Sequence, residues 1–151
     1  MSELEDLYQE VILEHSKHPR NFRVMEIANR QAEGYNPLCG DHYTIFLDVE
    51  DGAIRDISFQ GSGCAISKAS ASMMSQALKS KTTAQAEDIF YKFHGVIAGA
   101  QTGEKTGDVE GLGKLAVFAG VANFPTRIKC ATLAWHTLHA ALEGKQVAST
   151  E

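Results

Sequence analysis

The chain has 151 residues, of which 44% are hydrophobic and 22% charged, enough for one domain with a buried core and no disulfide staples. Its net charge of −5 argues against nucleic acid as a partner. No run reaches the about 18 apolar residues of a membrane helix, and the N-terminus (Met1-Ser2-Glu3-Leu4-Glu5-Asp6) is acidic where a signal peptide is basic. We therefore expect no membrane partner and a cytoplasmic location.

The N-terminal segment is predicted to form an amphipathic helix. Apolar residues recur there at i, i+3, i+4, i+7 and i+8, namely Leu4, Leu7, Tyr8, Val11 and Ile12. Ser2 and Glu5 have the spacing of a capping box, and His18-Pro19 stops the helix. Residues 20–34 are polar and mixed, which predicts an irregular connection.

A β-hairpin is predicted next. Asp41–Glu50 and Ala53–Gln60 alternate in hydrophobicity, and Asp51-Gly52 between them is a strong hairpin signal. The glycines of Gly61-Ser62-Gly63-Cys64 then allow the backbone to turn, and Ala65–Lys79 reads as a helix of small residues that can pack closely on a sheet.

The second half of the chain is predicted to be mostly helical. Thr82 and Gln85 form a capping box before an amphipathic helix that reaches Ile97. Dense glycines over 95–113 indicate a flexible surface excursion, and no strand or Gly-Lys-Ser/Thr sequence marks it as a phosphate loop. Leu115–Val121 is predicted to be helical, and Asn123-Phe124-Pro125 to break the chain.

The last helix has one apolar face, formed by Ala131, Ala134, Trp135, Leu138, Ala141 and Leu142. Cys130 is placed at its first turn, and Gly144 at its C-terminal end. His136 and His139 fall on the opposite face, where we expect a solvent-exposed pair.

Three cysteines carry the candidate chemistry. Scattered cysteines in a reducing compartment are most often small buried hydrophobes. Here each one stands at a structural corner: Cys39 in a Pro/Gly-flanked turn before a strand, Cys64 between strand and helix, and Cys130 at a helix start. A helix N-terminus favours the thiolate, which is the form that binds metals and attacks sulfur.

Asp41 joins this set because it lies two residues beyond Cys39, so in extended chain both side chains point to the same side. Three thiolates and one carboxylate suit tetrahedral Zn²⁺, although a turn-capping aspartate is the alternative for Asp41. The cysteine spacing fits no short zinc-ribbon pattern, so the fold would have to assemble the site. His42 has the opposite strand parity, and we exclude it. Lys129 beside Cys130 would favour its thiolate, or would simply be a solvated cation.

Three segments now resemble the cysteine motifs of the IscU/NifU N-terminal family, and specifically its SufU branch: Tyr35–Asp41, Gly61–Ser67 and Arg127–Trp135. The resemblance covers nearly the whole chain, with the motifs in order. It implies an α+β fold in which a small antiparallel β-sheet packs against helices and the cysteines meet at one exposed end. It also implies a single domain over 1–151 with a Gly-rich insertion at about 95–113.

The family resemblance implies a role in iron–sulfur cluster assembly beside a SufS-like cysteine desulfurase, with downstream assembly proteins as further partners. SufU-type members hold zinc on the positions of Cys39, Asp41, Cys64 and Cys130, and accept sulfur from the desulfurase. Cys39 would be the sulfur acceptor, freed when the desulfurase supplies a replacement ligand, and Arg127 the partner contact. Scaffold members instead build a [2Fe–2S] cluster on the cysteines.

Two sequence departures separate these branches. Lys129 stands where scaffold members carry a histidine, and Phe124–Lys129 replaces their Leu-Pro-Pro-Val-Lys segment. The Gly-rich insertion is also typical of the SufU branch. We therefore expect a zinc-bound sulfur acceptor that activates its desulfurase, closer to a sulfurtransferase than to a stand-alone enzyme. A [2Fe–2S] or iron scaffold, and an adaptor with a purely structural metal, are the alternatives.

Overall fold

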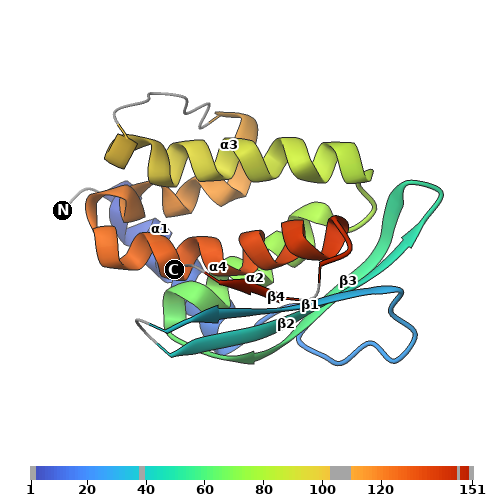
Figure 1. Ribbon diagram of the computed structural model, residues 1–151. Coiled ribbons are helices and arrows are strands. Elements are labelled where there is room, and N and C mark those ends of the chain that lie inside the picture. Colours follow the sequence, from blue (N-terminus) through green and yellow to red (C-terminus); the bar gives the residue numbers. More distant parts are fainter. Residues whose placement is uncertain (1–2, 38–39, 103–109, 146, 150–151) are drawn as a thin grey trace.

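The computed structural model describes residues 3–37, 40–102, 110–145 and 147–149. Helices and strands follow in chain order as α1 (Glu3–Lys17), β1 (Arg30–Asn36), β2 (Asp41–Glu50), β3 (Ala53–Ser62), α2 (Ala65–Leu78), α3 (Thr83–Thr102), the 3₁₀ helix η1 (Glu110–Asn123), α4 (Pro125–Leu142) and β4 (Val147–Ser149). The sheet lies on one side and the helices cover its other face (Figure 1). The predicted α+β fold is confirmed.

The sheet has the strand order β3-β2-β1-β4, with β1, β2 and β3 antiparallel and the short β4 parallel to β1. Asp51 and Gly52 both have positive φ, 53° and 76°, as a type I′ hairpin turn requires. The predicted hairpin is therefore confirmed. At the other end of β2, Asn36 pairs with Asp41 across the β1–β2 ladder, which places two polar residues side by side.

Strand β1 is a correction to the sequence prediction, which expected residues 20–34 to be irregular. Its three inward-facing residues are Ala32, Gly34 and Asn36, too small or too polar to show apolar alternation. The backbone of Gly34 lies directly under α4, because a Cβ there would come within 3.0 Å of the Thr137 hydroxyl. A glycine is what allows the helix to sit this close to the sheet.

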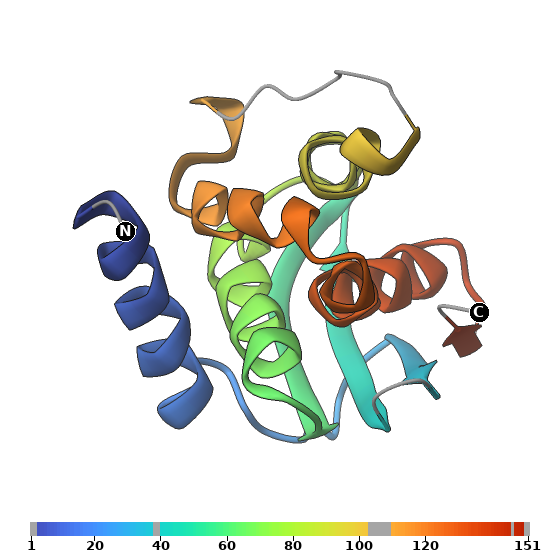
Figure 2. The same cartoon turned by 90° about the vertical axis from the view of Figure 1, so that its left-hand side faces the viewer.

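Helices α2 and α4 lie on the sheet and are joined by a buried polar link. The Ser70 hydroxyl donates to the Ala131 carbonyl at 2.6 Å and accepts from Trp135 Nε1 at 3.1 Å. Trp135 is fully buried and stacks on Phe93 of α3 with the ring centroids 4.5 Å apart. Figure 2 shows α3 lying outside α4 and η1, and α1 standing alongside α2. These contacts fix the positions from which α2 and α4 approach one end of the sheet.

The glycine-rich stretch is partly helical, which corrects the expectation of a flexible excursion across 95–113. Residues 95–102 continue α3, because the buried side chains of Phe93 and Ile97 hold this helix against η1. Residues 103–109 lie outside the described residues. The backbone of η1 breaks at Gly113, where φ is 57° and ψ is −126°. That this region is an insertion stays a prediction.

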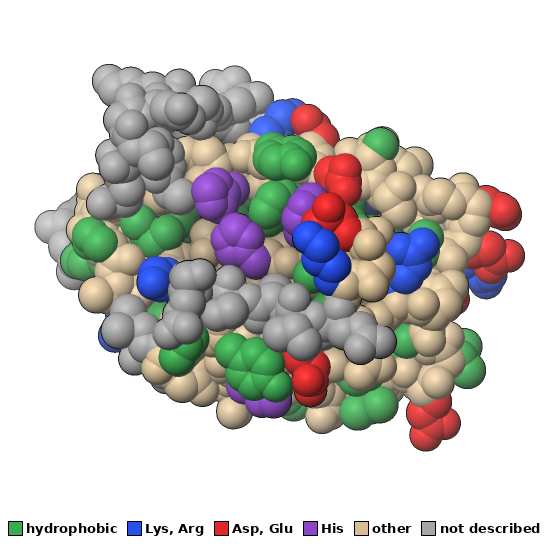
Figure 3. Space-filling view, viewed as in Figure 1, with side chains coloured by type: hydrophobic (Ala, Val, Ile, Leu, Met, Phe, Trp, Pro, Cys, Tyr) green, Lys and Arg blue, Asp and Glu red, His purple; other side chains and the backbone are tan. Residues whose placement is uncertain are grey.

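The histidines of α4 are a third correction, since His136 and His139 are half-buried against α3 rather than solvent-exposed. His139 stacks on Phe90 at 4.9 Å, and His136 lies 5.4 Å from His94, both measured between ring centroids. Helix α3 covers the face of α4 that turns away from the sheet, and histidine side chains gather over these two helices (Figure 3). No helix in the described part of the chain is long and apolar enough to cross a membrane.

Candidate metal centre

Cys64 is positioned by the junction of β3 and α2. It is the N-cap of α2, and its sulfur accepts the backbone N–H of Ser67 at 3.4 Å. Gly63 makes room for this arrangement, because a Cβ there would lie within 3.0 Å of Asp41, Ser67 and Tyr43 side-chain oxygens. The predicted helix N-terminus at the Cys64 sulfur is therefore confirmed.

Asp41 begins β2 and is only 1% exposed. Its Oδ1 accepts the backbone N–H of Cys64 at 2.9 Å, and its Oδ2 accepts the Asn36 side-chain amide at 3.1 Å. Both donors are neutral, so they orient the carboxylate without balancing its charge. A buried carboxylate in this state favours a nearby cation.

Cys130 enters the site from α4, but not from the first turn that the sequence indicated. The helix begins at Pro125, so Cys130 is its sixth residue and lies beyond the unpaired N–H groups of the helix start. Its sulfur is fully buried and instead accepts the Asn36 amide at 3.6 Å. The prediction that a helix N-terminus supports the Cys130 thiolate was wrong.

The three side chains converge. One carboxylate oxygen of Asp41 and the sulfurs of Cys64 and Cys130 all lie within 4.8 Å of one another. They come from a strand, a strand–helix junction and a helix, and residues 41 and 130 are far apart in sequence. Cys39, the fourth predicted ligand and the predicted sulfur acceptor, lies outside the described residues.

The electrostatics of the cluster favour the thiolate form of Cys64. A hydrogen bond from the Cys130 thiol lowers the pKa of Cys64 to about 5, opposed by burial and helped by the Ser67 N–H and hydroxyl. The thiolate form of Cys64 is thus favoured. One carboxyl group and two cysteine sulfurs within reach of one another match the Cys and Asp ligands that Zn²⁺ takes at tetrahedral sites. The residues present fit a zinc ion, with Asp41, Cys64 and Cys130 to hold it.

A model of the NifU-like N terminal domain family matches residues 7–131. The chain belongs to this family. The zinc-dependent sulfurtransferase SufU of Bacillus subtilis is 38% identical over 135 residues, covering 89% of this chain and 88% of that protein. The iron–sulfur cluster assembly scaffold protein IscU of Streptococcus pyogenes is 36% identical over 143 residues, covering 95% and 87%. The resemblance to the SufU branch of the IscU/NifU family is confirmed.

A solved structure supports the same family. A candidate iron–sulfur cluster assembly scaffold protein for the SUF system from Fervidobacterium islandicum AW-1 superposes with a TM-score of 0.83 at 34% identity. The match covers 91% of this chain and 98% of that one. Sheet order and helix arrangement are thus those of a family member across nearly the full length.

The remaining candidates lie outside the cluster. His42 is exposed and stacks on Tyr35 with ring centroids 4.3 Å apart, in keeping with its exclusion. Arg127 and Lys129 are exposed on α4, three residues and one residue before Cys130. Arg127 as a partner contact stays a prediction.

Three residues that support the site were not singled out from the sequence. Asn36 contacts both Asp41 and Cys130, and the Ser67 hydroxyl contacts Tyr43 Oη at 2.9 Å below Cys64. Burial raises the pKa of Tyr43, so its hydroxyl stays protonated. The usable signal was position: Asn36 opens the segment that holds Cys39 and Asp41, and Ser67 is three residues after a helix N-cap.

Proposed function

We propose that this protein serves iron–sulfur cluster assembly as a zinc-bound acceptor of sulfur from a SufS-like cysteine desulfurase. One observation carries the proposal: Asp41, Cys64 and Cys130 bring three metal-ligand atoms within 4.8 Å of one another. The family membership and the name of the Bacillus subtilis relative support it. Free thiols of this kind need a reducing compartment, in keeping with a cytoplasmic location.

The proposed ligand set is Cys39, Asp41, Cys64 and Cys130. Bound zinc supplies a positive charge that keeps its cysteine ligands deprotonated. The protein's own residues prepare the place for it: Asn36 orients Asp41 and Cys130 together, and Ser67 fixes the Cys64 sulfur at the start of α2. Outer hydrogen bonds of this type orient ligands and tune a metal site.

Sulfur transfer is proposed to occur on Cys39. Its thiolate attacks the outer sulfur of the desulfurase persulfide, so that one S–S bond forms as another breaks. The desulfurase cysteine leaves as a thiolate, and Cys39 becomes the persulfide with no net oxidation. Arg127, exposed on the first turn of α4 near Cys130, is proposed to contact the desulfurase.

A [2Fe–2S] scaffold is the second candidate, because several relatives, including the Streptococcus pyogenes protein, bear that name. Lys129 weighs against a scaffold. A charged lysine beside Cys130 has no lone pair with which to bind a metal, whereas a neutral histidine at that position does. The same three cysteines would hold the cluster, so the ligand geometry alone fits either occupant.

Metal analysis together with desulfurase turnover tests the proposal. Freshly purified protein is expected to carry one zinc per chain and to raise turnover, with the gain lost in Cys39→Ala although the fold is kept. A brown protein with visible absorbance after anaerobic loading with iron and sulfide, and turnover unaffected by Cys39→Ala, would favour the scaffold. A metal whose removal unfolds the chain while cysteine substitutions leave turnover intact would favour a structural adaptor.

A further inference from the structure

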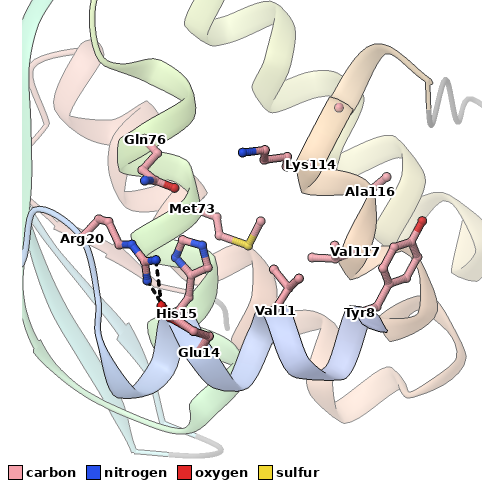
Figure 4. Close-up of a pocket in the computed structure, with 11 residues that line it drawn as sticks. Tyr8, Val11, Glu14, His15, Arg20, Met73, Gln76, Lys114, Ala116 and Val117 are labelled. Atoms are coloured by element: carbon pink, nitrogen blue, oxygen red, sulfur yellow. Dashed lines mark hydrogen bonds and ion pairs between the residues drawn. The ribbon is translucent and has the colours of Figure 1, made fainter. Parts of the chain in front are cut away.

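Away from the candidate metal centre, a cavity lies between α1, α2 and η1 (Figure 4). Its volume is about 470 Å³, within the range of pockets that hold small molecules. Figure 4 shows Val11 of α1, Met73 of α2 and Val117 of η1 forming an apolar wall. A cavity with this wall buries the hydrocarbon part of a ligand.

One polar side chain, that of His15, is buried in the lining of this cavity. His15 is only 8% exposed, and its Nδ1 lies 2.7 Å from the Ser72 hydroxyl oxygen. That oxygen also accepts the backbone N–H of Arg20 at 2.9 Å, an arrangement that suits a Ser72 hydroxyl donating to Nδ1. In that tautomer the His15 Nε2 carries the ring proton. Figure 4 shows the ring turned into the cavity.

The charges around the cavity favour an anion. Lys114 reaches across its upper side toward Gln76, and no ion-pair partner for it lies in the described residues (Figure 4). The other cation, Arg20, donates two hydrogen bonds of 2.9 Å to the Glu14 carboxylate, so these two charges neutralise each other. The cavity is left with one net positive charge, in a chain whose net charge is −5.

We infer that this cavity binds a small amphipathic monocarboxylate, with its chain against Val11, Met73 and Val117 and its carboxylate against Lys114 and the His15 Nε2–H. The donor set suits one negative charge, because it offers a single uncommitted cation and neutral donors. A doubly charged phosphate head is matched less well by one cation, and the Arg20 guanidinium, which could bind phosphate through two hydrogen bonds, is paired with Glu14.

Octanoate is a suitable probe, titrated into the zinc-loaded full chain by calorimetry and followed by amide NMR shifts. We expect binding with shifts confined to α1, α2 around Met73 and Gln76, and η1. Octanol, which has the same chain without the charge, should bind at least about tenfold more weakly, the typical worth of a hydrogen bond to a charged group. Octyl phosphate should bind no tighter than octanoate.

Two variants and a matched control locate the site. Lys114→Gln should weaken octanoate about tenfold, and Ala116→Leu, which fills the cavity from η1, should abolish binding. Lys145→Gln removes one exposed lysine beyond the end of α4 and should change nothing. No octanoate binding, equal binding of octanol, tighter binding of octyl phosphate, an unaffected Lys114→Gln variant, or shifts centred on Asp41 and Cys64 would each overturn the inference. None of these outcomes bears on the sulfur-acceptor proposal.

Discussion

At the scale of single residues, Asn36 holds together two side chains of the candidate metal centre, Asp41 and Cys130. Its side-chain amide lies 3.1 Å from Asp41 Oδ2 and 3.6 Å from the Cys130 sulfur, and the residue is fully buried. An amide carries no charge, so Asn36 brings two ligand candidates together without adding to their mutual repulsion. It is therefore a positioning residue for the site.

Asn36→Leu is expected to lower zinc affinity by about 10- to 100-fold, the typical effect of losing an outer hydrogen bond at a metal site. The change keeps the side-chain size but leaves Asp41 Oδ2 and the Cys130 sulfur without this donor. Chelator competition measures the affinity. The matched control is Gln31→Leu, an exposed amide on the same strand, which should leave zinc affinity unchanged. Equal affinity in both variants would mean that Asn36 is only a packing residue.

Asp41→Ala is expected to weaken zinc binding more than Asn36→Leu does, because it removes a proposed ligand and also the acceptor of the Cys64 N–H. The same chelator competition tests this. Asp48→Ala, a carboxylate further along β2, serves as the control. If zinc affinity is unchanged in Asp41→Ala, the carboxylate is not a ligand and acts only as a cap for the Cys64 backbone.

At the scale of elements, the junction of β3 and α2 is the tightest part of the site. Gly63 has no room for a Cβ, since side-chain oxygens of Asp41, Ser67 and Tyr43 surround it. We expect Gly63→Ala to destabilise the fold by about 1–3 kcal/mol, as overpacking does, and to lower zinc affinity by displacing Cys64. Urea unfolding and chelator competition measure the two effects.

Gly120→Ala is the matched control, because a Cβ at Gly120 meets nothing within 4 Å. It should leave stability within about 0.5 kcal/mol, as surface substitutions usually do, and zinc affinity unchanged. A Gly63→Ala protein that matches this control in both measurements would show that the junction relaxes freely.

The same elements show which features the sequence can specify. The Asp51-Gly52 hairpin and the Thr82–Gln85 capping box depend on neighbouring residues, and both occur as predicted. The strand β1 could not be predicted, because its inward residues are small to admit α4, a demand made by distant packing. The predicted break at Asn123-Phe124-Pro125 lies where η1 ends and α4 begins. The sequence analysis placed Cys130 in the first turn of the last helix, whereas α4 already begins at Pro125, a position that proline favours.

For the candidate site, the three motifs that resemble the family group Asp41, Cys64 and Cys130 from the sequence, and strand parity links Asp41 to Cys39. The contact of Asn36 with Cys130 could not be predicted, because it joins residues 94 positions apart. Nothing local in the chain indicates which helix turn will face which strand end. Only the packed arrangement of α4 on β1 and β2 supplies that information.

At the scale of the whole molecule, the layered packing of α3 on α4 buries titratable groups that have no part in the metal centre. His136 faces His94 of α3 and Phe90, while His139 on the same helix lies near Glu87 and, at 3.1 Å, Glu143. Burial, with smaller contributions from the charges of His94 and His139, lowers the pKa of His136 to about 4. The neutral imidazole is thus the form that this packing accepts.

This burial predicts a pH dependence of stability that is independent of the cysteines. Because the pKa of His136 is lower in the folded than in the unfolded chain, its full contribution is present above about pH 6.5, the ordinary histidine pKa. Stability is then lost as the pH falls toward 4, by about 2 kcal/mol at pH 5.

His136→Phe removes the titrating group while keeping a ring against Phe90. The free energy of urea unfolding should therefore fall less between pH 7.5 and pH 5 in this variant than in the unsubstituted protein. His18→Gln, at an exposed histidine after α1, should retain the full loss. Comparing variants cancels any effect of metal release, which acid causes in all three proteins. If His136→Phe loses as much stability as His18→Gln, the α3–α4 interface tolerates a charged imidazole.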